Sequence, residues 1–188
     1  MKTLKGLGID WRDRRMIHQL YMNQNAVVRV VDGESEPGVI GRGVRQGCPL
    51  SPLLFSIYAE AMMIETLEGN EEGVMVGGEL IPDVRFADDQ GMISNSEGGL
   101  QRLMDRLNEV AKSYKMKINM KKTKTMIVSR TEGKTVDISI EGQKVEQVKK
   151  FKYLGAVISE DGRCIDDVKQ RIAMGKEAFN KTRELMTG

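Results

Sequence analysis

The sequence predicts an α+β fold in which helices pack on one face of an antiparallel sheet. Strand-like runs are followed by tight-turn residues, as in Ala26 to Val31 followed by Asp32-Gly33. Segments whose apolar residues recur three or four positions apart alternate with these runs and indicate helices. A length of 188 residues with 40% hydrophobic content is enough for one domain with a core.

Four helices are expected. Ser51-Pro52 supplies an N-cap and a proline at the first helical position, and the helix that follows is apolar on most sides, which predicts burial. Ser96 is expected to cap the next helix, which should pack one face on the sheet. The expected helices are Asp10 to Met22, Ser51 to Leu67, Ser96 to Tyr114, and Ile165 to Met186.

The strands are expected in pairs and in a later meander. Each expected strand is bounded by glycine, proline or charged residues, which are typical of turns. They are Ala26 to Val31 with Gly38 to Arg42, Val74 to Val76 with Leu80 to Phe86, Gln90 to Ser94, Thr125 to Ser129, Val136 to Ile140, Lys144 to Val148, and Lys152 to Ser159. No internal repeat or low-complexity linker is present in the sequence.

Composition excludes several classes of protein. Cys48 and Cys164 lie far apart, which predicts buried thiols in a reducing compartment and no disulfide partner, and the lone His18 cannot anchor a metal cluster. No apolar run approaches the roughly 18 residues that cross a bilayer, and the N-terminus has no secretion signal. We expect an intracellular protein, nuclear or cytoplasmic and not secreted, with no membrane partner.

Charge is unevenly distributed along the chain. Residues 1 to 101 carry 9 basic and 15 acidic side chains, a net charge of −6, whereas residues 102 to 188 carry 20 and 12, a net charge of +8. Between Lys112 and Arg130 there are seven basic residues and no acidic one. This density is suited to neutralising phosphates, although a solvated lysine face is an equally good explanation of so short a run.

The most informative segment is Phe86-Ala87-Asp88-Asp89, in which two adjacent carboxylates lie at the turn between two strand-like runs. Neighbouring side chains on a strand alternate between faces, so a pair that acts together must be brought together by the turn around a shared positive charge. Mg²⁺ takes one or two protein carboxylates and leaves its other positions to water and phosphates. The alternative explanation is a solvated turn whose aspartates cap local amides.

A second distinctive segment, Gly43 to Pro52, is a glycine-flanked loop that leads into a helix start. Glycine allows close approach of the backbone to a ligand, Gln46 can bond a base or sugar edge, and a helix N-terminus favours anions. A triphosphate or a template strand would satisfy all three features. An ordinary loop and helix cap would also explain them.

Four segments resemble, in order and spacing, the reverse transcriptase domain of non-LTR (LINE-like) retrotransposons. The resemblance covers most of the chain. The segments are Gly43 to Pro52, Phe86 to Asp89, Lys117-Ile118-Asn119-Met120-Lys121-Lys122-Thr123-Lys124, and Phe151-Lys152-Tyr153-Leu154-Gly155. The resemblance implies a partial domain over residues 1–188. Its expected parts are a fingers-like remnant over about 1–50, a palm over about 51–130, and a primer-grip meander with a C-terminal helix over about 131–188.

The resemblance implies an RNA-directed DNA polymerase whose partners are an RNA template, a DNA primer and a dNTP. The primer 3′-hydroxyl would attack the α-phosphate of the dNTP with the help of two Mg²⁺ ions, or of Mn²⁺. The implied roles are metal binding and catalysis for Asp88 and Asp89, nucleotide or template contact for Arg45, Gln46 and Gly47, leaving-group or phosphate contact for Lys121, Lys122 or Lys124, and a primer grip for Phe151, Tyr153, Leu154 and Gly155.

One feature of the family is missing from this chain. Polymerases of this family need a further metal-binding aspartate on an upstream strand, and no such strand precedes Asp10 and Asp13, which lie at an expected helix start. We therefore expect a truncated domain, inactive by itself. Two alternatives stay open, namely a catalytically silent nucleic-acid-binding remnant of the palm and an unstable relic with no role.

Overall fold

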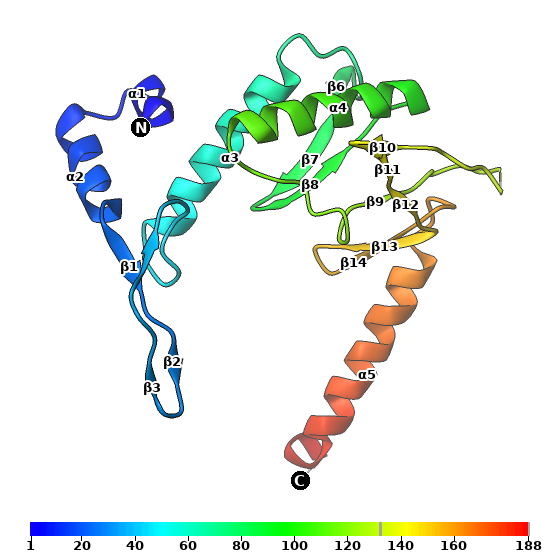
Figure 1. Cartoon of the computed structure of the whole chain (residues 1–188). Coiled ribbons are helices and arrows are strands. Elements are labelled where there is room, and N and C mark those ends of the chain that lie inside the picture. The colour runs from blue at the N-terminus through cyan, green and yellow to red at the C-terminus, as the bar shows by residue number, and fades with distance from the viewer. Residues whose placement is uncertain (132, 188) are drawn as a thin grey trace. The chain divides into compact units, whose positions relative to one another are not determined.

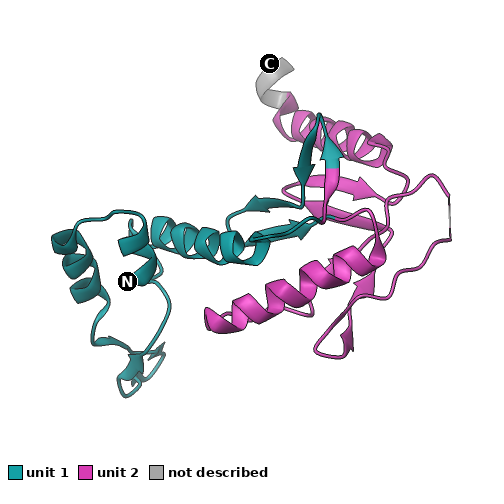
Figure 2. Ribbon diagram, turned by 90° about the horizontal axis from the view of Figure 1, so that it is seen from above, with its two compact units in different colours: residues 1–71, 75–93 teal, residues 72–74, 94–188 magenta. Residues whose placement is uncertain are grey.

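The computed structural model describes residues 1–131 and 133–187 (Figure 1). These residues form two compact units, coloured separately in Figure 2. The first unit comprises Met1–Glu71 and Met75–Ile93, and the second comprises Glu72–Val74 and Ser94–Gly188. Within the described residues, no helix combines the length and the apolar content that crossing a membrane requires.

The described chain is of the α+β class, as the sequence predicts. Its helices are α1 (Lys2–Gly6), α2 (Trp11–Tyr21), α3 (Ser51–Leu67), α4 (Glu97–Ser113) and α5 (Ile165–Thr187). Its strands are β1 (Gln24–Ala26), β2 (Arg29–Val30), β3 (Gly33–Glu34), β4 (Gly38–Ile40), β5 (Val74–Val76), β6 (Glu79–Ile81), β7 (Asp83–Phe86), β8 (Asp89–Met92), β9 (Lys124–Thr125), β10 (Ser139–Ile140), β11 (Gln143–Lys144), β12 (Glu146–Gln147), β13 (Lys150–Tyr153) and β14 (Ala156–Ser159).

The expected continuous sheet is not formed among the described residues, where every hydrogen-bonded ladder has two strands. Six of the seven ladders join β1 to β4, β2 to β3, β5 to β6, β7 to β8, β10 to β11, and β13 to β14. The seventh joins β9 and β12 in parallel, with Thr125 opposite Gln147. All of these strands among the described residues are only two to four residues long, because turn residues interrupt them.

Several predicted strands are shorter than expected for this reason. Pro82 divides the predicted strand Leu80 to Phe86 into β6 and β7, because proline has no N–H to donate to a ladder. The predicted strand Lys152 to Ser159 is instead the hairpin β13–β14, which turns at Leu154-Gly155. Of the predicted strand Thr125 to Ser129, only Thr125 lies in a strand, β9.

In the first unit, α1 contacts α3. Its buried apolar side chains include Leu4 of α1 and, on α3, Ala59, Met62 and Met63. The predicted burial of α3 on most sides is wrong, since Leu53 and Ile64 of the same helix are 58% and 62% exposed. An apolar helix is buried all round only where it is covered on all sides, and the described residues bury one face of α3.

In the second unit, α4 is held against β10 by side-chain to backbone bonds. Gln101 of α4 accepts a hydrogen bond from the Ser139 N–H at 2.9 Å and donates one to the Ser139 carbonyl at 2.8 Å. Ser96 caps α4 as predicted, because its hydroxyl accepts from the Gly99 N–H at 3.0 Å. The buried apolar side chains of this unit are Leu103, Met104, Leu107, Val110, Ala111, Val136, Ile138, Ile140 and Val145.

Substituting Gly99 with alanine should destabilise the second unit. A methyl group at Gly99 would overlap the Glu72 carboxylate and the Ser94 hydroxyl, and Glu72 is itself ion-paired with Arg102. We expect Gly99→Ala to lower the free energy of unfolding by about 1 to 3 kcal/mol, the usual cost of overpacking. Urea unfolding followed by circular dichroism measures this change.

Gly98→Ala is the matched control, because Gly98 is the adjacent residue of α4 and the nearest atom to its added methyl lies 3.4 Å away, on the flexible Arg102 side chain. Alanine has a higher helix propensity than glycine, so this variant should be stabilised by up to about 1 kcal/mol. Equal effects of the two substitutions would contradict the predicted overlap at Gly99.

Candidate active site

The two adjacent aspartates lie at the tip of the β7–β8 hairpin. Phe86 pairs with Asp89 across the ladder, so Ala87 and Asp88 form the two-residue turn. Asp89 is therefore the first residue of β8, whereas the sequence predicts it in the turn. Ala87 has φ = 54°, a left-handed conformation that residues with a Cβ adopt at a cost of about 1 kcal/mol or more.

The side chains of Asp88 and Asp89 are both exposed. Carboxylate oxygens are the ligands that Mg²⁺ takes from proteins, and exposure leaves room for the waters and phosphates that complete its coordination. Within residues 1–131 and 133–187, no group of three or more His, Cys, Asp or Glu side chains could hold a metal ion. The tip thus offers two carboxylates, which suits a metal that takes its other ligands from outside the described chain.

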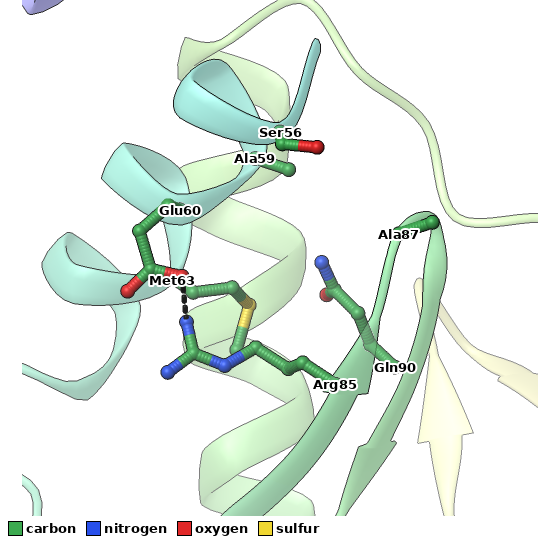
Figure 3. A pocket seen from close by; sticks show the side chains of 7 residues that line it. All are labelled: Ser56, Ala59, Glu60, Met63, Arg85, Ala87 and Gln90. Atoms are coloured by element: carbon green, nitrogen blue, oxygen red, sulfur yellow. Dashed lines mark hydrogen bonds and ion pairs between the residues drawn. The ribbon is translucent and has the colours of Figure 1, made fainter. Parts of the chain in front are cut away.

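The hairpin lies against α3, and a small cavity of about 170 Å³ separates them. Figure 3 shows the Gln90 side chain directed from the hairpin into the space below α3. Ala87 and Gln90 flank the aspartates in sequence, so the cavity lies close to the hairpin tip. The residues lining it are Ser56, Ala59, Glu60, Met63, Arg85, Ala87 and Gln90.

Arg85 connects the hairpin to α3 by bridging two carboxylates. Its Nη1 donates to Glu60 Oε2 of α3 at 2.8 Å, drawn as a dashed line in Figure 3. Its Nε lies 2.5 Å from Asp83 Oδ2 on the same strand. Arg85 and Asp83 are two residues apart on β7 and so share a face. The orientation of the hairpin against α3 therefore depends on the ion pair between Arg85 and Glu60.

Asp83 is the buried member of this group, with only 7% of its side chain exposed. Within the described residues no aligned hydrogen-bond donor reaches its Oδ2 atom, although Arg85 lies in ion-pair contact. Burial raises the pKa of Asp83, the positive charge of Arg85 lowers it, and the negative charge of Glu60 raises it, for a net increase. The charged form of Asp83 thus depends on Arg85.

The glycine-flanked loop forms a tight turn immediately before α3. The Cys48 N–H donates to the Arg45 carbonyl at 3.4 Å, so Gln46 and Gly47 are the central turn residues. Gly47 has φ = 84°, which a type II turn requires at its third position and which glycine adopts without strain. Arg45, Gln46 and Gly47 are all exposed, as contact with a ligand would require.

Tyr21 of α2 connects to this loop and to the start of α3. Its hydroxyl lies 2.9 Å from Ser51 Oγ and donates to Cys48 Sγ at 3.7 Å. Ser51 is accordingly the first residue of α3 rather than its N-cap, and the N-cap is Leu50, without a side-chain cap bond. The hydrogen bond from Tyr21, followed by backbone N–H groups of Leu50 and Ser51, lowers the pKa of the Cys48 thiol.

Tyr21→Phe should raise the pKa of the Cys48 thiol, because it removes the strongest hydrogen bond to the thiolate. Alkylation by iodoacetamide follows the thiolate, so the pH profile of labelling at Cys48 should move to higher pH. Mass spectrometry of the labelled peptides measures the two cysteines separately. Cys164 is exposed and serves as the internal control, and a shift at both cysteines would contradict the assigned role of Tyr21.

Of the two cysteines predicted to be buried, Cys48 is half-buried and Cys164 is exposed, so the prediction is wrong for Cys164. Cys164 immediately precedes α5, where Arg163, Cys164 and Ile165 are exposed. The apolar neighbour Ile165 is itself 52% exposed.

Helix α3 follows the glycine-flanked loop and also borders the cavity beside the hairpin of the first unit. The loop ends at the start of α3, and Ser56, which lines the cavity beside Ala87, lies five residues into the helix. Five residues correspond to a rise of about 7.5 Å. The loop thus leads into the first residue of α3, and the hairpin borders a cavity along the middle of the same helix.

The candidate phosphate-binding lysines lie in the second unit and differ in their surroundings. Asn119 Oδ1 accepts from the N–H groups of Lys121 and Lys122, which fixes a turn and leaves both side chains exposed. Lys124 instead pairs with Glu146 across the β9–β12 ladder, with Nζ 2.6 Å from Oε2. Lys121 and Lys122 are therefore the better candidates for contact with a ligand.

The predicted primer-grip residues form the β13–β14 hairpin. Tyr153 pairs with Ala156, so Leu154 and Gly155 form the turn, with φ of 49° and 84°. Positive φ at both central residues is typical of a type I′ turn, in which a leucine is unusual. Leu154 is 53% exposed and Phe151 is 37% exposed, so the hairpin presents apolar side chains to solvent.

Sequence reasoning missed the ion-pair group beneath the hairpin. Asp83 and Arg85 could have been found, because two opposite charges two residues apart on a strand lie on one face. Glu60 lies 25 residues before Arg85, and no sequence signal connects the two. Tyr21 was likewise placed only on an amphipathic helix, without its contacts to Cys48 and Ser51.

Comparison with protein families gives one match over most of the chain. Residues 1–158 match the family described as reverse transcriptase (RNA-dependent DNA polymerase). Among curated proteins, the chain is 29% identical over 160 residues to a Pol polyprotein from the type-1 retrotransposable element R2 of Nasonia vitripennis, a match that covers 79% of this chain and 15% of that protein.

Two further relatives come from Drosophila melanogaster. An RNA-directed DNA polymerase from the mobile element jockey is 28% identical over 137 residues, which is 68% of this chain and 14% of that protein. A Pol polyprotein from the type-2 element R2DM is 30% identical over 138 residues, which is 69% of this chain and 13% of that protein. The matched part of the chain thus spans about one seventh of the length of each of these three relatives.

Proposed function

The chain belongs to the reverse transcriptase family and is a fragment of a reverse transcriptase domain of the non-LTR type, and we propose from this that it carries part of the active site of an RNA-directed DNA polymerase. The reaction joins a dNTP to a primer on an RNA template. A bond forms between the primer 3′-oxygen and the α-phosphorus, and the bond to the β-phosphate breaks and releases pyrophosphate. An intracellular location, where templates and dNTPs are found, belongs to the same proposal.

The single observation that carries the proposal is the Asp88-Asp89 pair at an exposed hairpin tip, which borders a cavity against α3. Asp88 lies in the two-residue turn and Asp89 begins β8, and both residues are exposed, so water and phosphates can reach this end of the hairpin. The exposed glycine-flanked loop, which precedes the same helix and can approach a ligand closely, supports nucleotide binding by this unit.

Asp88 and Asp89 are the residues proposed to hold divalent metal ions, Mg²⁺ or Mn²⁺, since enzymes of this family generally use them. When bound, such ions stabilise negative charge on the attacking and leaving oxygens of a phosphoryl transfer. Arg45 and Gln46 are proposed to contact the incoming nucleotide or template, and Lys121 or Lys122 to neutralise phosphates. The palm arrangement and the primer-grip role of Phe151 to Gly155 belong to the same proposal.

The alternative function is binding of nucleic acid without catalysis. Two observations favour it, namely the net charge of +8 in the second half of the sequence and the lack of a three-carboxylate group among the described residues. Such a module would bind an RNA–DNA duplex with an affinity that falls steeply with salt and would incorporate no dNTP.

Primer extension tests the proposal. A 5′-labelled DNA primer on an RNA template is incubated with dNTPs and Mg²⁺, using both the 188-residue chain and the longest reading frame that contains it. Template-directed extension by the longer protein supports the polymerase. Salt-sensitive duplex binding with no extension by either protein supports the silent module and overturns the polymerase proposal.

A further inference from the structure

The connection between β4 and α3, residues 41–50, is fixed at its start to the last turn of α2. It follows Ile40 of β4, which pairs with Gln24 of β1. Gln24 is buried, and its Nε2 donates to the Leu20 carbonyl of α2 at 3.0 Å. The position at which the connection leaves β4 is therefore set by the end of α2.

The connection is fixed at its other end to the same turn of α2, by Tyr21, the last residue of that helix. The Tyr21 hydroxyl donates its one proton to Cys48 Sγ, 3.7 Å away. Ser51 Oγ lies 2.9 Å from the same hydroxyl oxygen and is then the donor of the second hydrogen bond. Ser51 is buried and begins α3, so one hydroxyl joins α2 both to the end of the connection and to the start of α3.

Tyr21 also restrains the turn that lies within the connection. Among the described residues, no side chain outside residues 41–50 other than that of Tyr21 is hydrogen-bonded to this connection. The Cys48 N–H donates to the Arg45 carbonyl at 3.4 Å, so the turn that carries Gln46 ends at the residue that Tyr21 contacts. Arg45 and Gln46 are exposed, whereas Cys48 is half-buried. Loss of the Tyr21 hydroxyl should therefore free this turn rather than unfold the unit.

We propose that Tyr21 is a positioning residue for nucleotide binding, whose hydroxyl orders the turn of Arg45 and Gln46 before the incoming dNTP binds. This inference rests on the proposed polymerase function, in which that turn contacts the nucleotide. A loop that is already ordered loses less conformational entropy on binding, so the affinity is higher. The hydroxyl contacts Cys48 and Ser51, neither of which has a role in the reaction, so it affects binding rather than the chemical step.

Tyr21→Phe tests this role, because it removes the hydroxyl and keeps the ring. In the longest reading frame that contains this chain, the Kd of the dNTP should rise about fivefold, the usual effect of one hydrogen bond. The maximum rate should stay within about twofold. Single-turnover addition of one nucleotide, measured over a range of dNTP concentrations, gives both values. A lower maximum rate with an unchanged Kd would overturn the proposal.

A variant without the two partners shows whether the hydroxyl acts through them. In a protein that carries Cys48→Ala with Ser51→Ala, Tyr21→Phe should change the Kd of the dNTP by less than about twofold. A fivefold change in both backgrounds would overturn the proposed route. Tyr58→Phe is the matched control, because it removes a hydroxyl from α3 of the same unit and should leave the Kd within about twofold. Equal effects of Tyr21→Phe and Tyr58→Phe would also overturn the proposal.

Trypsin cleavage after Arg45 follows the turn in the 188-residue chain, without nucleotide or activity. A turn released from α2 opens more often, so Tyr21→Phe should speed this cleavage about fivefold. Cleavage after Lys122, an exposed residue of the second unit, should not change. Faster cleavage after Arg45, with no primer extension by the longer protein, would refute the polymerase proposal and leave the anchoring of the turn by Tyr21 standing. Unchanged cleavage together with an unchanged Kd of the dNTP would overturn the role of Tyr21 in an active polymerase.

Discussion

Asp88→Asn should reduce template-directed primer extension by about 1,000-fold or more in the longest reading frame that contains this chain. An amide in place of a carboxylate removes a negative ligand from the exposed tip of the β7–β8 hairpin. Metal ions contribute several kcal/mol of charge stabilisation to phosphoryl transfer, and each 1.4 kcal/mol or so is a factor of ten in rate. Gel analysis of primer extension under single-turnover conditions measures the change.

Asp32→Asn is the control for this substitution. Asp32 is exposed and, like Asp88, is the second residue of a two-residue hairpin turn, here between β2 and β3. Its substitution makes the same chemical change at an equivalent position, so extension should stay within about twofold of the unchanged protein. Extension that survives the combined change of Asp88 and Asp89 to asparagine would disprove the metal site.

Local signals predicted the parts of this fold that depend on nearby residues. Ser96 caps α4 as predicted, since an N-cap needs only the three residues that follow it. The turn at Gly77-Gly78 also joins paired strands as predicted, because glycine supplies the backbone freedom of a tight turn. The hairpin predicted at Asp32-Gly33 differs, since the chain turns at Val31-Asp32 into β3, and the expected return strand at Gly38 pairs with β1 instead.

Features that depend on distant contacts were not predictable in the same way. Ser51 has the sequence of an N-cap, but its hydroxyl lies against that of Tyr21, thirty residues earlier in the chain. The hydrophobicity of α3 predicted burial, whereas the described residues cover only one face of it. The hydrophobicity of a helix indicates how much its burial would favour folding, but it does not identify the surface that would cover the helix.

The candidate site also combines features that nearby residues predict with features that depend on distant contacts. The turn between the two strands and the place of Asp88 in it could be predicted, because the strand-like runs on both sides define the turn locally, although Asp89 begins β8. The Arg85 bridge to Glu60 could not, since it joins a strand to a helix across 25 residues. The bridge nevertheless determines how the hairpin is held, which makes it the best point at which to test the packing beneath the site.

Arg85→Met should destabilise the first unit by about 2 kcal/mol near neutral pH. Removing one member of a buried ion pair leaves the other charge uncompensated, at a cost of about 3 to 5 kcal/mol, and a smaller value is expected here because 32% of the Arg85 side chain is exposed. Glu60→Gln is the control, because Glu60 is 55% exposed and its pairing with Arg85 should contribute less than about 1 kcal/mol.

The pH dependence of the Arg85→Met variant identifies Asp83 as the cause. The pKa of Asp83 is raised on folding, so the folded state binds more protons, and stability falls as pH rises from the unfolded value through the folded one. Without Arg85 only burial and Glu60 act on this pKa, and both raise it. Urea midpoints measured from about pH 4 to about pH 7 should therefore fall more steeply in the variant than in the unchanged chain. The double variant Asp83→Asn with Arg85→Met should lose the additional dependence of the urea midpoint on pH. It should also recover most of the stability that Arg85→Met loses, because a neutral amide leaves no buried charge to compensate. A double variant as unstable and as pH-dependent as Arg85→Met alone would place the destabilisation elsewhere than at Asp83.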